Sequence, residues 1–197
     1  PPAFLQNSTD TILGLEALAD LPRLSELVLH GGITDEGLRV VGSFPQLNTL
    51  TIWSDKVSAD GWINLEPLQT LDRLTIHCCD LWHSRPVGEP YRLVTRPISD
   101  TSLISISHLR ELKHLAISHA ALSDRGLGSL ARMTKLETLE VGQIKSIGEG
   151  LRRIIALPKL RRLTISSSVI TDNVVAELKK NRPDIDIVCH HTIPESV

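Results

Sequence analysis

The sequence predicts an α/β fold, a right-handed solenoid with a parallel sheet on its concave face and helices on its convex face. Two recurring patterns predict it. A six-residue frame, Leu-x-x-Leu-x-(Leu, Ile or Val), begins at Leu24, Leu47, Leu71, Leu112, Leu136 and Leu160. About ten residues after the start of most frames, an apolar residue precedes Ser or Thr and an acidic residue. Spacings of 23 or 24 residues between frames are typical of repeats that bury their apolar side only against their neighbours.

Each repeat is expected to contain a short strand followed by a helix. The frame predicts the strand, because apolar residues alternate only there. The second pattern predicts the helix start, since a Ser or Thr hydroxyl can accept a hydrogen bond from a free backbone N–H and an acid favours the positive end of the helix dipole. Strands joined by helices run parallel with right-handed crossovers. Helices are wider than strands, so stacking bends the array with its strands on the inside.

The two ends of the array are less regular than its middle. Residues 11–22 carry helical spacing and are expected to be the helix of an earlier unit, with no strand before residue 11. Residues 184–188 are expected to form a last, short strand. We expect residues 1–197 to form one domain of about six to seven repeats. The start at Pro1 instead of Met suggests a fragment of a larger protein or a processed product.

Together the two patterns resemble the leucine-rich-repeat family over about residues 11–188. The resemblance is to the helix-containing, ribonuclease-inhibitor-like subclass, and residues 170–187 resemble the last repeat of bacterial members. The family places Asn or Cys in the turn after each strand. Here that position holds Gly32, Asp55, Cys79, Ala120, Ile144 and Ser168. Since Asn is absent, the turns must be bonded differently. The resemblance implies a protein-recognition scaffold without catalysis.

Candidate binding residues lie on the predicted concave surface. Side chains alternate along a strand, so the residues that flank the two core-facing positions of each frame point outward. One outward column begins with His30, Trp53 and His77, and another contains Arg73 and His114. Only 3% of the residues are aromatic, and aromatic residues are enriched where partners bind. The alternative interpretation is that these rings only cover each other and the sheet.

The regular spacing breaks once, between Leu71 and Leu112. That step is 41 residues, so 17 extra residues lie between Cys79 and Ile98. Long loops in compact domains are usually functional or disordered. Residues 80–97 contain residue types enriched at binding hot spots, namely Trp82, Arg85, Tyr91 and Arg92. We expect either a recognition loop over the Trp53–His77 end of the sheet or a tolerated surface insertion.

Metal binding and catalysis are both weakly indicated. His77 with Cys78, Cys79 and His83 offers metal ligands, as does the Cys-His-His run that starts at Cys189. Neither set has the paired spacing of a structural zinc site. His77 and His83 are the better candidates. Phosphate-binding, nucleophile-elbow and metalloprotease motifs are absent from the sequence, so we expect a protein that is not an enzyme and has no cofactor.

Charge and cysteine content limit the expected partners. With 21 basic and 23 acidic residues and a net charge of -2, the sequence does not favour nucleic acid or an anionic membrane. Three cysteines form no disulfide framework, which favours a cytoplasmic location. The expected function is a scaffold that binds a protein partner on its concave face with help from residues 80–97. Two alternatives stay open: a C-terminal sensor domain of a multidomain bacterial signalling or defence ATPase, and a metal- or small-ligand-binding protein using His77 and His83.

Overall fold

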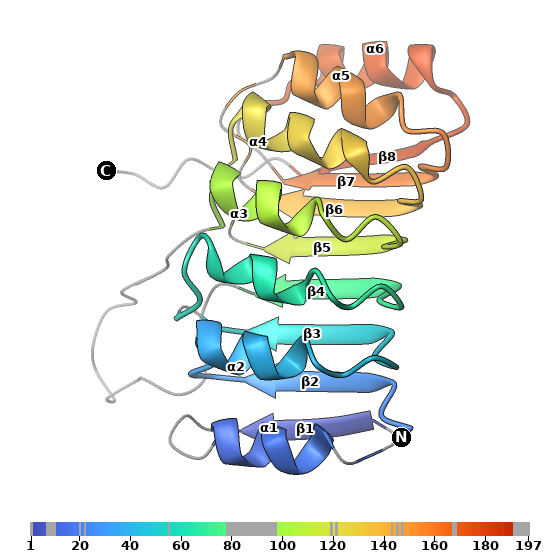
Figure 1. The fold of residues 1–197 in the computed structure, drawn as a ribbon. Coiled ribbons are helices and arrows are strands. Elements are labelled where there is room, and N and C mark those ends of the chain that lie inside the picture. Colours follow the sequence, from blue (N-terminus) through green and yellow to red (C-terminus); the bar gives the residue numbers. More distant parts are fainter. Residues whose placement is uncertain are drawn as a thin grey trace.

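The structure is a computed structural model that describes residues 2–6, 11–19, 21, 23–54, 56–77, 98–118, 120, 122–142, 144, 146, 148–166 and 169–190. Within these residues, eight parallel strands form one sheet in chain order (Figure 1). They are β1 Pro2–Gln6, β2 Glu26–His30, β3 Thr49–Trp53, β4 Arg73–His77, β5 His114–Ser118, β6 Thr138–Gly142, β7 Arg162–Ser166 and β8 Asp186–His190. The sheet forms the concave face of a right-handed solenoid, as the repeat spacing predicts.

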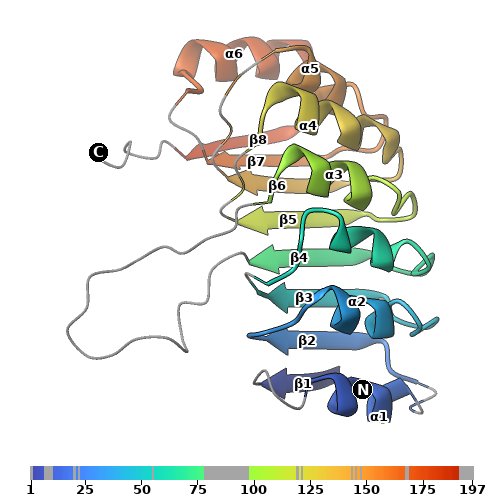
Figure 2. The ribbon, with the colours of Figure 1, turned by 60° about the vertical axis from the view of Figure 1, so that its left-hand side comes forward.

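Helices cover the other face of the sheet and form the convex side (Figures 1 and 2). The described helices are α1 Thr11–Ala19, α2 Asp35–Val41, the 3-10 helix η1 Gly61–Leu65, α3 Asp100–Ile106, α4 Asp124–Ser129, the 3-10 helix η2 Leu130–Arg132, α5 Glu149–Ile155 and α6 Asp172–Asn181. The repeat that contains η1 departs from the expected α-helix. Pro67 follows η1 by two residues, and the residue between them, Glu66, still has helical backbone angles. None of the described helices has both the length and the apolar character needed to cross a membrane.

The sheet register aligns the core-facing leucines of neighbouring repeats. Leu50 pairs with Leu74, and Leu74 pairs with Leu115 across the long step in the sequence. Leu50 and Leu74 are fully buried, and each strand from β2 to β7 alternates buried and outward-facing residues. The 17 extra residues therefore leave the stacking of β4 on β5 unchanged. Residues 78–97 lie outside the described part of the chain.

Helix starts confirm the predicted capping at several repeats. Thr34, Ser99 and Ser123 each accept a hydrogen bond from a backbone N–H in the first turn of α2, α3 and α4. No side-chain cap forms at Thr171, the N-cap residue of α6. Ser58 likewise accepts at 3.0 Å from the backbone N–H of Gly61, the first residue of η1, so the hydroxyl marks the helix start in four repeats, and α6 begins without this bond.

The acidic residue of the second pattern has a role beyond the helix dipole. Asp35 Oδ1 accepts a hydrogen bond at 2.8 Å from the backbone N–H of Ser58, one repeat further on. Asp124 Oδ1 likewise accepts at 2.9 Å from the backbone N–H of Gly150. Hydrogen bonds to charged groups contribute about 1.5–3 kcal/mol each. These carboxylates therefore join consecutive repeats on the helical side, as the strands join them on the concave side.

Both ends of the sheet differ from the sequence-based expectation. The prediction that no strand precedes residue 11 was wrong, because β1 pairs with β2 in register from Pro2 opposite Glu26. In β2 the first Leu of the frame, Leu24, precedes Glu26 by two residues. The equivalent position of β1 falls before residue 1, so the frame could not be recognised there. At the other end, β8 begins and ends two residues later than the expected 184–188.

Candidate functional site

Three rings stack along the concave face at the carboxyl ends of β2, β3 and β4. The sheet register places His30 beside Trp53 and Trp53 beside His77. The centroids of the His30 and Trp53 rings are 5.5 Å apart with an interplanar angle of 14°. The Trp53 and His77 rings lie closer, at 3.7 Å and 19°. All three side chains are half-buried. We call these three residues the ring stack; the structure brings them together as their shared column predicts.

Ser118 fixes the last ring of the stack. His77 Nδ1 lies 3.0 Å from Ser118 Oγ, and the Ser118 hydroxyl donates at 3.3 Å to the carbonyl of Ile76. A hydroxyl that donates to a carbonyl can still accept, so this geometry favours a proton on His77 Nδ1. The contact therefore orients the imidazole.

A second group of predicted residues lies at the opposite ends of the strands. Arg73 and His114 are the first residues of β4 and β5, and they line a depression of about 280 Å³ on the concave face. His114 Nδ1 lies 2.7 Å from Thr138 Oγ1. Arg73 and His77 are the two ends of one five-residue strand, about 13 Å apart at 3.3 Å per residue. The predicted residues thus form two groups, and the ring stack does not line this depression.

Burial lowers the pKa of His114, and the positive charge of Arg73 lowers this pKa further. Glu137 and Asp72 act in the opposite direction but do not reverse the shift. In the unfolded chain this imidazole has a pKa of about 6.5. As pH falls through that value, the unfolded state takes up the proton first, so His114 reduces the stability of the folded state at acidic pH.

The variant His114→Gln is expected to lose less stability than the wild type between pH 7.5 and pH 5. The reason is that Gln has no proton to take up on unfolding. Urea unfolding of both proteins at the two pH values measures this difference, with the other histidines common to both. An equal loss of stability in the two proteins would contradict the lowered pKa.

Four predicted contact residues, Trp82, Arg85, Tyr91 and Arg92, lie outside the described part of the chain, as does His83. Among the described residues, no group of three or more His, Cys, Asp or Glu is arranged to hold a metal ion. Burial raises the pKa of the Cys189 thiol, with a further contribution from Asp172. The thiol form predominates there, and it is the thiolate that binds metals.

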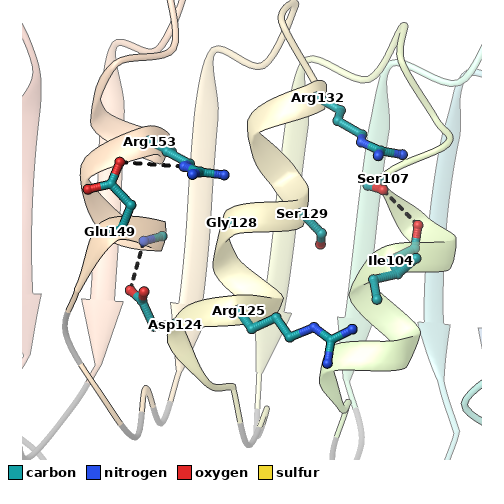
Figure 3. Close-up of a pocket in the computed structure, with 10 residues that line it drawn as sticks. Ile104, Ser107, Asp124, Arg125, Gly128, Ser129, Arg132, Glu149 and Arg153 are labelled. Atoms are coloured by element: carbon teal, nitrogen blue, oxygen red, sulfur yellow. Dashed lines mark hydrogen bonds and ion pairs between the residues drawn. The ribbon is translucent and has the colours of Figure 1, made fainter.

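A groove on the convex side was not predicted from the sequence. It lies over α3, α4 and α5, has a volume of about 440 Å³, and is shown in Figure 3. Its lining residues are Ile104, Ser107, Asp124, Arg125, Gly128, Ser129, Arg132, Glu149, Gly150 and Arg153. We call it the convex groove. These residues come from three repeats, singly or in adjacent pairs, so no contiguous motif marks them.

The two helical glycines of the convex groove have different surroundings. A Cβ at Gly150 would lie 1.9 Å from the backbone oxygen of Asp124 and 2.9 Å from the backbone nitrogen of Gly128. A Cβ at Gly128 would meet only the Cα of Gly150, at an ordinary 3.6 Å. Close packing of α5 on α4 therefore requires Gly150. It does not require Gly128, where the missing side chain leaves the floor of the groove open.

No protein-family model and no curated protein matches this sequence. Among solved structures, TLR13 in its complex with ssRNA13 is similar over 97% of this chain and 33% of its own, with a TM-score of 0.55 and 15% identity. The internalin InlF of Listeria monocytogenes is similar over 90% and 52%, with a TM-score of 0.48 and 16% identity. A leucine-rich-repeat protein of Leptospira interrogans is similar over 87% and 56%, with a TM-score of 0.35 and 15% identity. This chain thus spans between a third and just over half of the length of these proteins.

Proposed function

We propose that this chain, which has the leucine-rich-repeat fold, is a non-catalytic interaction module that binds a protein partner on the concave face of its sheet. The ring stack is the observation that supports this most strongly. His30, Trp53 and His77 present a half-buried aromatic surface on a face that no described helix covers. Aromatic side chains of this kind dominate the binding energy of protein interfaces.

The ring stack is already ordered before a partner arrives. Trp53 is held on both faces by imidazoles, and His77 is held in turn by Ser118. Ordering a side chain on binding costs about 0.5–1.5 kcal/mol, and the stack avoids most of that cost. The indole edge and the outer imidazole of His30 are then available for contact with the partner.

The rest of the concave face favours a protein over a nucleic acid. The first residues of the strands carry both signs of charge, with Arg73 and Arg162 set against Glu26 and Asp186. Arg162 already pairs with Asp186 at 2.9 Å. A nucleic-acid surface would present a continuous basic track. TLR13 is seen with an RNA, but the mixed charges here suit a partner with polar groups of both signs.

Residues 80–97 are proposed to complete the concave site. Residue 78 follows His77 directly in the chain, so the segment leaves the sheet beside the ring stack. Its Trp82, Arg85, Tyr91 and Arg92 would then contact the same partner. Substituting these four residues by Ala together should weaken binding without changing β4 or β5, whose pairing does not depend on the segment.

Substitution of Trp53 by Ala is expected to abolish recovery of the partner in a crosslinking pull-down from the native cell, because it removes the centre of the ring stack. Loss of the stacking contacts should cost about 1–2 kcal/mol of stability. Thermal unfolding would show that the variant still folds. Ile63→Ala is the matched control, since Ile63 is exposed on η1 at 39%. Recovery that survives Trp53→Ala and is lost with Ile63→Ala would reject the proposal.

A further inference from the structure

We propose that the convex groove is a second docking surface, independent of the concave site, which takes an acidic amphipathic helix of a partner protein. Within the described part of the chain, the guanidinium groups of Arg125 and Arg132 make no hydrogen bond or ion pair. The other charged groups of the groove are engaged locally. Glu149 pairs with Arg153 at 3.5 Å, and Asp124 accepts hydrogen bonds from the backbone of the next repeat. Two cations are therefore available to a ligand.

The small net charge of the chain conceals a strong separation of charge along it. Residues 11–72 contain three basic and nine acidic residues, whereas residues 107–166 contain eleven basic and five acidic residues. The convex groove lies within the basic stretch. A basic region of this size attracts acidic partners and increases the rate at which they associate.

The spacing of the two arginines fits one face of a helix. Arg125 and Arg132 are seven residues apart, and both side chains extend towards α3, with Ile104 between them (Figure 3). Arg125 lies on α4 and Arg132 is the last residue of η2, so four α-helical and three 3-10 steps separate them by about 12 Å along the axis. Seven residues of a partner α-helix rise a similar distance, about 10.5 Å. A partner helix with Glu, Leu and Glu at positions i, i+3 and i+7 presents all three on one face at that spacing. Its carboxylates can meet the two guanidinium groups while its Leu covers Ile104, which is 38% exposed.

The floor of the groove leaves space for such side chains. Gly128 and Ser129 lie on α4 between the two arginines, and nothing around Gly128 requires a glycine for packing. Glycine inside a helix is unfavourable relative to alanine. An open floor in the groove explains why a glycine stands at this position.

An acidic helix suits this groove better than a nucleic acid does. The carboxylates of Asp124 and Glu149 lie in the groove lining, so the lining does not form the continuous basic track that a chain of phosphates requires. No Trp, Tyr or Phe is among the described residues that line it, so bases would find no ring on which to stack. A partner helix needs only the two arginines for its two carboxylates, and it needs no aromatic ring on which to stack.

Fluorescence anisotropy with a labelled peptide tests the proposal. The probe is a helical peptide of about 16 residues that carries Glu-x-x-Leu-x-x-x-Glu on an Ala and Gln background, titrated with the full chain at low salt. The double variant Arg125→Gln with Arg132→Gln is expected to weaken binding at least tenfold, because each loses a charge-assisted hydrogen bond. Replacing both Glu of the peptide by Gln should weaken binding to a similar extent.

The control variant, Arg110→Gln with Arg152→Gln, removes the same charge from the same basic stretch outside the groove. It is expected to bind the peptide within about threefold of the wild type. Equal weakening by both double variants would overturn the proposal, since it would show diffuse attraction without a site. Tighter binding of a single-stranded DNA 12-mer through the same two arginines would also overturn it. Circular dichroism of each variant shows whether its fold is intact.

Discussion

Substitution of Gly150 by Ala is expected to destabilise the protein by about 3 kcal/mol or more. The added Cβ would lie 1.9 Å from the backbone oxygen of Asp124. A backbone atom cannot rotate away as a flexible side chain can, so α4 and α5 must separate. Their separation would also stretch the hydrogen bond from the Gly150 N–H to the Asp124 carboxylate.

Gly128→Ala is the matched control on the neighbouring helix. Its Cβ would meet only ordinary van der Waals contact, and Ala in a helix is more favourable than Gly by about 1 kcal/mol. We therefore expect this variant to be as stable as the wild type or slightly more stable. Urea unfolding followed by circular dichroism measures both changes. Equal stability of the two variants would contradict the close approach of α5 to α4.

Substitution of Asp100 by Ala is expected to cost about 2–3 kcal/mol, because it removes a carboxylate that joins two repeats. The Ser123 backbone N–H donates to Asp100 Oδ1 at 2.9 Å, and the Ser123 hydroxyl donates to Oδ2. Both donors would be left without this acceptor. Ser123 also caps α4, so the start of that helix should loosen as well.

Asp60→Ala provides the comparison for Asp100. Asp60 is the acidic residue before η1, one position further from Ser58 than Asp100 is from Ser99, and it is exposed and makes no side-chain capping bond. Its removal is expected to change stability by less than about 0.5 kcal/mol. Hydrogen exchange of the α4 amides would locate the effect of Asp100→Ala. Similar losses for the two variants would mean that the carboxylate acts only through the helix dipole.

Much of the fold could be predicted because one spacing controls it. The frame fixes which leucines face the core, and the register then places Leu50 beside Leu74 and Leu74 beside Leu115. The same alternation placed His30, Trp53 and His77 in one outward column. That their rings stack follows from the strand spacing of about 4.8 Å, which brings neighbouring side chains of a column into contact.

Other features depend on contacts that a single repeat does not encode. The frame of β1 could not be recognised, because its first position lies before residue 1 and its second position holds Ala3, opposite Leu27. The acidic residues were expected to act on their own helix, whereas Asp35 and Asp124 bond to the next repeat. The convex groove is formed by three repeats together, so only the stacked structure brings Arg125 and Arg132 over Ile104.

Photo-crosslinking in the native cell tests the proposed binding face most directly. A photoreactive amino acid replaces Thr75, the central outward residue of β4 between Arg73 and His77, and in a second protein it replaces Ile63 on η1, which lies outside the convex groove. Binding on the concave face predicts a covalent adduct from position 75 that disappears when Trp53→Ala is added, and none from position 63. An adduct from position 63 with none from position 75 would contradict it.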